Sequence, residues 1–254
     1  MTRTFALVAA TALIGSTTAV AQLPQAKLFS VFPPGAQVGI ATEVAISNGV
    51  ELDEANRLIF NHPGITAAQK VNEANGVKTP VANTFIVNVA AGVPDGIYEV
   101  RFGGRFGVSN PRSFVVGSRK EISEVEPNNA REQATPVELN STVNGRTDGN
   151  AYDYFKFTGK AGQRIVCVCQ ASKIDSKLKP VLELYDATGV IPPPAAGAPA
   201  APAPQAVLSG RRLAATRGSA RRDAVLDVTL LADGDYFVLI IDQVLAAASI
   251  ISIA

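Results

Sequence analysis

The run Gly234-Asp235-Tyr236-Phe237-Val238-Leu239-Ile240-Ile241 decides the fold of the second half of the chain. A Gly-Asp pair, typical of turns, is followed by a run of apolar residues, so a strand built from this run is apolar on both faces. Strands of this kind are buried on both sides. The run therefore predicts a central strand of a covered sheet.

The segments around this run alternate apolar and polar residues with a period of two. Such alternation places the apolar side chains on one face of a strand, so it predicts antiparallel strands that are half covered by a partner sheet. The apolar members of these segments are Val44 and Ile46, Phe85, Val87 and Val89, Val100 and Phe102, Phe155 and Phe157, Leu182 and Leu184, and Leu226, Val228 and Leu230.

The spacing of turn formers divides the chain into two blocks. Gly, Pro and Asn residues break residues 27–117 into about seven short strands, which is typical of an immunoglobulin-like sandwich. A polar junction follows at residues 118–123, and the same pattern of strands then resumes. We therefore predict an all-β protein of two β-sandwich domains, the first at residues 22–117 and the second at residues 124–254.

A segment of the second block, residues 191–206, consists almost wholly of Pro, Ala and Gly. Such a composition offers little side-chain burial to offset the entropy lost on ordering. We expect a disordered loop between two strands.

The N-terminus has the pattern of a secretory signal peptide. Arg3 precedes an apolar run, and Ala19-Val20-Ala21 forms a small-residue cleavage site. The apolar run is only about ten residues long, too short to cross a hydrocarbon layer of about 30 Å. We expect residues 1–21 to be removed, with no membrane span after cleavage, and a secreted, periplasmic or cell-envelope location.

The composition argues against several classes of function. The formal net charge is +1 with both signs interspersed, so no nucleic-acid partner is expected. Cys167 and Cys169 share one face of a predicted strand, where a disulfide between them would be badly strained, so both are expected to be small buried side chains. The single histidine, His62, lies in a predicted turn, and no nucleophile elbow accompanies it. We expect no catalytic activity.

Residues 245–254 are apolar and end abruptly. We interpret them as a final strand or as the end of a chain truncated after Val244.

Oxygen-bearing side chains gather in the stretch Glu124-Val125-Glu126-Pro127-Asn128-Asn129 and again in Asp148-Gly149-Asn150-Ala151-Tyr152-Asp153. Ca²⁺ takes six to eight oxygen ligands from carboxylates, amides and the backbone. The two stretches therefore predict a calcium site at the start of the second sandwich. The alternative is that the acids of the first stretch are solvated, that residues 127–129 form a turn, and that Asp153 caps a strand.

An ordered set of short motifs in residues 122–245 resembles the bacterial pre-peptidase C-terminal domain, which is similar to the collagen-binding domain of clostridial collagenases. Residues 31–35, 58–64 and 105–112 resemble the immunoglobulin-like module that precedes such domains in large secreted bacterial proteins. The motifs of the first resemblance are Glu124-x-Glu126-Pro127-Asn128-Asn129, Val143-Asn144-Gly145, Asp153-Tyr154-Phe155-Lys156-Phe157, Gly162-Gln163, Leu182-x-Leu184-Tyr185-Asp186 with Gly189, and Asp233-Gly234-Asp235-Tyr236.

The resemblance implies a jelly-roll sandwich that is non-catalytic and holds a structural Ca²⁺ near its N-terminal linker. The chain departs from the family pattern at Ala151, where an acid is usual, so Asp148 or Asn150 would have to compensate. We expect weak binding, with a Kd of about 10⁻⁴–10⁻³ M. The implied ligands are Glu124, Glu126, Asn128, Asn129 and Asp153, together with Asp148 and Asn150.

The leading functional hypothesis is a secreted, non-catalytic binding, adhesion or spacer module with Ca²⁺ at its inter-domain linker. Its expected partner is an extracellular polymer or protein: a polysaccharide, peptidoglycan or a collagen-like peptide. Two alternatives remain. The chain is the accessory part of a secreted protease or other hydrolase, or it is a structural component of the cell envelope.

Overall fold

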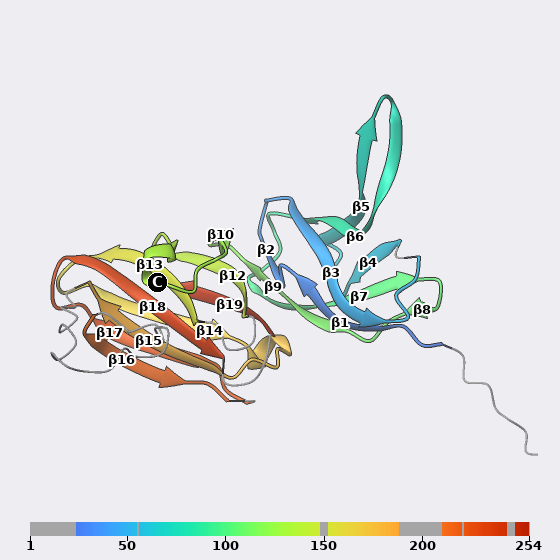
Figure 1. The fold of residues 1–254 in the computed structure, drawn as a ribbon. Helices are drawn as coiled ribbons and strands as arrows, with labels where there is room; N and C mark the ends of the chain where they lie inside the picture. The colour runs from blue at the N-terminus through green and yellow to red at the C-terminus, as the bar shows by residue number, and fades with distance from the viewer. Residues whose placement is uncertain are drawn as a thin grey trace, which may run out of the picture.

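A computed structural model describes residues 24–54, 56–147, 152–187, 210–219, 221–242 and 247–253. The predicted signal peptide and the predicted loop at residues 191–206 lie outside the described residues. The described part is built almost entirely from β-strands, arranged as two β-sandwiches (Figure 1). The all-β prediction is confirmed. None of the described residues form a helix that is long and apolar enough to cross a membrane.

The N-terminal sandwich consists of one antiparallel sheet and one sheet in which β2 pairs in parallel with β9; apart from β2, the strand order is that of an immunoglobulin constant-type domain. One sheet has the order β1-β3-β6-β5 and the other β2-β9-β7-β4, with the short β8 paired to β7. The strands are β1 (Lys27–Phe32), β2 (Gly35–Gln37), β3 (Thr42–Val50), β4 (Arg57–Phe60), β5 (Ile65–Ala74), β6 (Val77–Val89), β7 (Gly96–Gly104), β8 (Gly107–Val108) and β9 (Arg112–Gly117).

The predicted alternation builds the core of this sandwich. Phe85 and Val87 of β6 face Val100 and Phe102 of β7, and all four side chains are fully buried. The polar residues between them point away from the core because successive side chains of a strand lie on opposite faces. The far ends of β5 and β6 leave the sandwich as a two-stranded hairpin, turned by Asn75 and Gly76, both with positive φ (Figure 1).

The C-terminal sandwich has two five-stranded sheets. The junction sheet has the order β10-β12-β19-β14-β17, and the distal sheet has the order β11-β13-β18-β15-β16. Apart from β15 and β16, which pair within the distal sheet, successive strands pass from one sheet to the other in the manner of a jelly roll. The elements are β10 (Lys120–Ser123), η1 (Arg131–Gln133), β11 (Thr135–Pro136), β12 (Ser141–Thr147), β13 (Tyr152–Gly159), β14 (Arg164–Gln170), η2 (Ser172–Ile174), β15 (Pro180–Asp186), β16 (Arg212–Arg217), β17 (Ala224–Thr229), β18 (Gly234–Asp242) and β19 (Ala247–Ile253).

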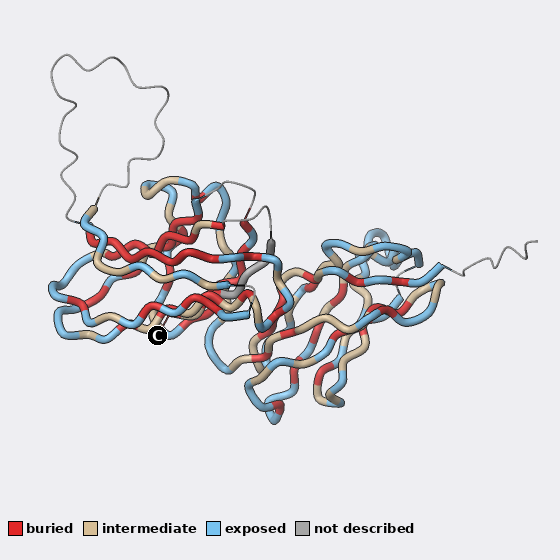
Figure 2. The backbone as a smooth tube through the Cα atoms, turned by 90° about the horizontal axis from the view of Figure 1, so that it is seen from below, coloured by how far each residue is buried: buried red, intermediate tan, exposed pale blue. Residues whose placement is uncertain are grey.

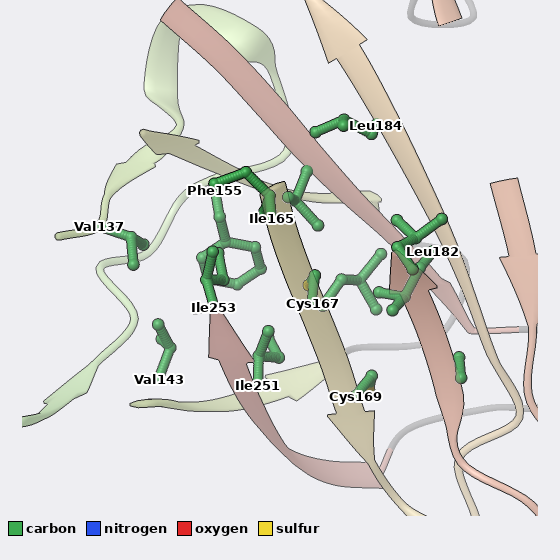
Figure 3. Close-up of a cluster of buried hydrophobic side chains, with 14 of the residues drawn as sticks. Val137, Val143, Phe155, Ile165, Cys167, Cys169, Leu182, Leu184, Ile251 and Ile253 are labelled. Atoms are coloured by element: carbon green, nitrogen blue, oxygen red, sulfur yellow. The ribbon is translucent and has the colours of Figure 1, made fainter. Parts of the chain in front are cut away.

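The apolar run at residues 237–241 lies in β18, the central strand of the distal sheet. Val238 and Ile240 point into the main core, and Phe237 and Leu239 pack on the other face of the sheet. The central position predicted for this strand is therefore correct. Phe155 of β13 packs in the same core (Figure 3), and the buried residues run as a continuous layer through the sandwich (Figure 2).

Three other predictions concern the junction sheet. Cys167 and Cys169 of β14 are buried free thiols that face the core, as expected (Figure 3). The C-terminal segment forms β19, which lies between β12 and β14 and so closes the sheet. Residues 120–123, within the segment expected to be a linker, form β10, which pairs in parallel with β12.

The outer face of the junction sheet meets the N-terminal sandwich. Asp175, in the loop after β14, accepts hydrogen bonds at Oδ2 from the backbone N (3.2 Å) and the Oγ (2.8 Å) of Ser113. Arg112 donates from Nη2 to the Asp175 carbonyl at 2.6 Å. Asp175 therefore ties the C-terminal sandwich to β9 of the N-terminal sandwich.

Replacing Asp175 tests whether this contact fixes the angle between the sandwiches. Asp175 has a positive φ of 58°, so Asp175→Gly removes the carboxylate without backbone strain. We expect small-angle scattering to show a larger radius of gyration and a broader range of shapes than for the wild type. Asn75→Gly, at the other positive-φ position noted above, is the matched control. Unchanged scattering for Asp175→Gly would contradict the prediction.

Candidate functional site

The predicted calcium ligands of the linker lie at one end of the C-terminal sandwich, where the chain crosses from the junction sheet to the distal sheet. The Glu124 amide donates to the Asn144 carbonyl at 3.0 Å, which extends the pairing of β10 with β12. The Tyr154 amide then donates to the Asn128 carbonyl at 2.9 Å. Residues 124–128 are therefore held to a strand of each sheet.

Glu124 is packed against the backbone of β12. Its Oε1 accepts a hydrogen bond from the Arg146 amide at 2.5 Å. Its Oε2 is buried and has no hydrogen-bond partner among the described residues. A Cβ atom at Gly145 would lie 2.7 Å from that oxygen, so glycine at this position leaves the room that the carboxylate needs.

Burial has a strong effect on the Glu124 carboxyl. Loss of solvation raises its pKa to about 7, the Arg146 amide opposes this change, and the neighbouring charge of Glu126 adds to it. The Asn128 amide lies near enough to lower this pKa, but the contact lacks the geometry of a hydrogen bond.

Asn128 is fully buried, although it lies in an otherwise exposed segment. Its backbone amide donates to Glu126 Oε2 at 3.1 Å. Its side-chain Oδ1 and Nδ2 are both buried, and neither makes a hydrogen bond within the described part of the chain. Glu124, Glu126 and Asn128, which we call the linker cluster, therefore combine two carboxylates with an amide that has unused hydrogen-bonding capacity.

Asp153 lies one residue before the contact between Tyr154 and the linker. Only 2% of its surface is exposed, and it lies on the same face of β13 as the core residue Phe155. Burial raises the pKa of the Cys169 thiol, and carboxylates that include Asp153 raise it further, which places Asp153 toward the sandwich interior.

The structure thus brings together some of the predicted ligands. Glu124, Glu126 and Asn128 lie together, and Asp153 follows on the adjoining strand. Asn129 is exposed. Asp148 and Asn150 lie outside the described residues. Within the described ranges, no group of three or more His, Cys, Asp or Glu side chains is placed to hold a metal ion.

Arg146 was missed by the sequence analysis, although it connects the linker cluster to the N-terminal sandwich. Its guanidinium lies 3.9 Å from the centroid of the Phe32 ring and donates from Nη2 to Ser47 Oγ at 2.6 Å. Arg146 follows Asn144-Gly145, and this local sequence does not predict a contact with another domain. Its partners are about a hundred residues away in the sequence, so only the fold could identify them.

A groove of about 350 Å³ lies where the two sandwiches meet. Among the described residues that line it, Phe29 is the only aromatic one, and 45% of its surface is exposed. The groove is lined by Phe29, Ser30, Val31, Pro34 and Asn48, by Arg112 and Ser113, and by Ile174, Asp175, Ser176 and Lys177. Residues of both sandwiches therefore contribute to one concave surface.

Glu121 is a half-buried acid at the junction, and no motif in the sequence marks it. Its amide donates to Gln37 Oε1 at 3.3 Å across the junction, and its Oε2 accepts from Asn144 Nδ2 at 2.9 Å. Burial raises the Glu121 pKa to about 7, and the hydrogen bond from Asn144 opposes that change.

No family model matches the chain, and no curated protein sequence matches it. The solved structures with a similar fold include the pre-peptidase C-terminal domain of a collagenase from Bacillus anthracis. It is 11% identical, with a TM-score of 0.34, over 54% of this chain and 100% of that domain.

Two other similar structures are a periplasmic inhibitor of g-type lysozyme from Aeromonas hydrophila and the protein SGBP-B from Bacteroides ovatus, in complex with a mixed-linkage heptasaccharide. The inhibitor is 14% identical, with a TM-score of 0.31, over 53% of this chain and 98% of its own. SGBP-B is 11% identical, with a TM-score of 0.27, over 90% of this chain and 77% of its own. At these identities and TM-scores, the similarities carry no argument about ligand or activity.

The raised pKa of Glu121 predicts a pH dependence of stability that Glu121→Gln should reduce. Because the folded protein favours the neutral acid, the contribution of Glu121 is complete below a pH of about 4.5 and is lost as the pH rises through about 7. Between pH values of about 5 and 8, we expect the unfolding free energy of the wild type to fall by on the order of 2 kcal/mol more than that of the variant.

Urea unfolding in the presence of a chelator measures this difference. The exposed Glu132→Gln variant controls for the loss of a surface charge and should follow the wild type. Parallel pH profiles for the wild type and Glu121→Gln would show that the prediction is wrong.

Proposed function

We propose that the chain is a secreted, non-catalytic binding module in which two β-sandwiches, held at a fixed angle, present a ligand groove between them. The observation that carries this proposal is the groove of about 350 Å³ to which both sandwiches contribute and in which the ring of Phe29 is half exposed. A volume of this size suits part of a larger ligand.

The chemistry of the groove favours a polysaccharide as the ligand. The apolar face of Phe29 offers a flat surface on which a sugar ring can stack. Asn48, Arg112 and Lys177 lie in the same groove and can hydrogen-bond to hydroxyl groups.

The surroundings of the only histidine support a non-catalytic role. His62 Nδ1 accepts a hydrogen bond from the Gly64 amide at 3.1 Å. The His62 ring packs edge-on against the Tyr98 ring, with 5.3 Å between the ring centroids. These contacts make His62 part of a turn, and it does not line the groove.

Binding to a panel of insoluble polysaccharides, peptidoglycan and collagen-like peptides tests the groove. We expect retention on a polysaccharide, with no release of soluble products. Phe29→Ala should lower the affinity by about tenfold, because it removes the stacking surface. Tyr152→Ala, which removes an exposed aromatic ring elsewhere, should leave the affinity unchanged. Equal retention of Phe29→Ala and the wild type, or hydrolysis of the polymer, would argue against the proposal.

We further propose that the linker cluster holds a structural Ca²⁺. The donor set fits such an ion, since a buried Glu124 oxygen and the buried Asn128 Oδ1 lack partners among the described residues, and Glu126 adds a second carboxylate nearby. A bound Ca²⁺ would supply positive charge beside the Glu124 carboxylate, which burial and the neighbouring charge of Glu126 destabilise. Glu124 and Asn128 would then hold the linker more firmly against β12 and β13.

Adding Ca²⁺ at about 10 mM should stabilise the protein by about 1–3 kcal/mol, given the weak affinity expected. The measurement is the thermal unfolding temperature with Ca²⁺ and with chelator. Glu124→Gln should remove the Ca²⁺-dependent increase, whereas Glu132→Gln, at an exposed acid nearby, should retain it. If Ca²⁺ and chelator give the same unfolding temperature for the wild type, the linker cluster holds no calcium.

A further inference from the structure

A second hollow, of about 320 Å³, lies at the junction between the outer faces of two sheets. One wall comes from β7 and β9 of the N-terminal sandwich, and the other comes from the junction sheet. We call it the amine cleft. It is lined by Asp95, Gly96, Ile97, Val115, Val116, Gly117, Arg119, Glu121, Thr142, Gln170 and Ser252.

The wall formed by the junction sheet is polar. Glu121 of β10 is in register with Thr142 of β12, which in turn is in register with Ser252 of β19. Side chains that lie opposite one another on adjacent strands share a face, so these three form one row. Thr142 Oγ1 and Ser252 Oγ are hydrogen-bonded to each other at 3.3 Å. Both are neutral hydroxyl groups, so Glu121 is the charged group of the row.

Oxygen acceptors without donors gather around this row. Gln170 Oε1 is a buried atom with no hydrogen-bond partner among the described residues. The same is true of Oδ1 of Asn144, a residue only 2% exposed, whose Nδ2 donates to Glu121. Buried acceptors left without a donor cost free energy, and an unpaired buried carboxylate costs more. The polar wall therefore favours a ligand that is rich in N–H donors.

The opposite wall is apolar. Ile97 of β7 and Val115 of β9 are directly paired, and the neighbouring pair, Tyr98 and Phe114, points into the sandwich core. Ile97 and Val115 therefore point outward, and Ile97 is 46% exposed. The cleft offers apolar surface on one side and acceptor oxygens on the other.

The charges at the cleft favour a cation. Asp95 and Glu121 contribute two acids, whereas Arg119, an exposed residue, contributes one base. Asp95 Oδ2 already accepts a hydrogen bond from Ser118 Oγ at 2.9 Å. Glu121 therefore supplies the charge that is best placed to pair with a ligand inside the cleft.

We propose that the amine cleft binds a primary alkylammonium group, either the end of a lysine side chain on a partner polymer or a free aliphatic diamine. The ammonium group donates its N–H bonds to Glu121 and Gln170, and the methylene stem lies along Ile97 and Val115. This arrangement uses both walls, because the lysine side chain is itself apolar along its stem and charged at its end.

Calorimetric titration of the full chain at a pH of about 8 tests the proposal, with 1,5-diaminopentane and Nα-acetyl-lysine amide as probes. We expect saturable binding of at least one probe. Binding of the lysine derivative alone assigns the site to a side chain of a polymer, and equal binding of both assigns it to any primary alkylamine. Nε-acetylated lysine and tetramethylammonium, which lack the ammonium N–H donors, should not bind.

Three variants locate the binding at the cleft. Glu121→Gln removes the negative charge that pairs with the ammonium group, and Gln170→Met removes an acceptor oxygen, so each should lower the affinity by about tenfold. Ile97→Ala changes an exposed side chain on the opposite wall, so it should weaken binding without affecting folding. Glu99→Gln, at an exposed acid outside the cleft, should bind like the wild type. The proposal is wrong if neither probe binds, if tetramethylammonium binds equally well, or if the three cleft variants bind like the wild type.

Discussion

The hydrogen bond between the Glu124 carboxylate and the Arg146 amide connects the linker, the C-terminal sandwich and the N-terminal sandwich. It anchors the linker to β12, and the side chain of Arg146 then extends to Phe32 and Ser47 of the N-terminal sandwich. The same carboxylate has a buried oxygen that lacks a hydrogen-bond partner among the described residues. One acidic side chain thus links the proposed calcium site to the angle between the sandwiches.

The junction sheet is the reason that polar groups gather between the sandwiches. Its inner face builds the apolar core, so the strand period places Thr142, Asn144 and Arg146 on its outer face. In an isolated sandwich this face would be solvated. The N-terminal sandwich covers the part of this face around Glu121, Thr142 and Gln170, which costs desolvation energy and leaves Gln170 Oε1 without a donor among the described residues. The Phe29 groove and the amine cleft both lie at this junction.

Residue patterns predict the structure best where a strand has one buried face or two. Phe85 and Val87 alternate with polar residues, which predicted a strand with one buried face, because burial acts on every second residue of a half-covered strand. The continuous apolar run at 237–241 predicted a strand buried on both faces, because burial acts on every residue of a central strand. The calcium ligands were predicted as a sequence cluster. The structure brings Glu124, Glu126 and Asn128 together, whereas Asn129 is exposed, and both calcium binding and the family resemblance remain predictions.

The sequence by itself determined that the chain is all-β, that its strands form sandwiches, and that its two cysteines are buried, because these properties follow from local periodicity. Only the tertiary structure decided that Asp175 contacts β9, that Arg146 packs on Phe32, and that Glu121 is desolvated beside Gln37. Each of these contacts joins residues far apart in the sequence. Their energies depend on which faces are brought together and on how much water is excluded, and no local pattern of residues carries that information.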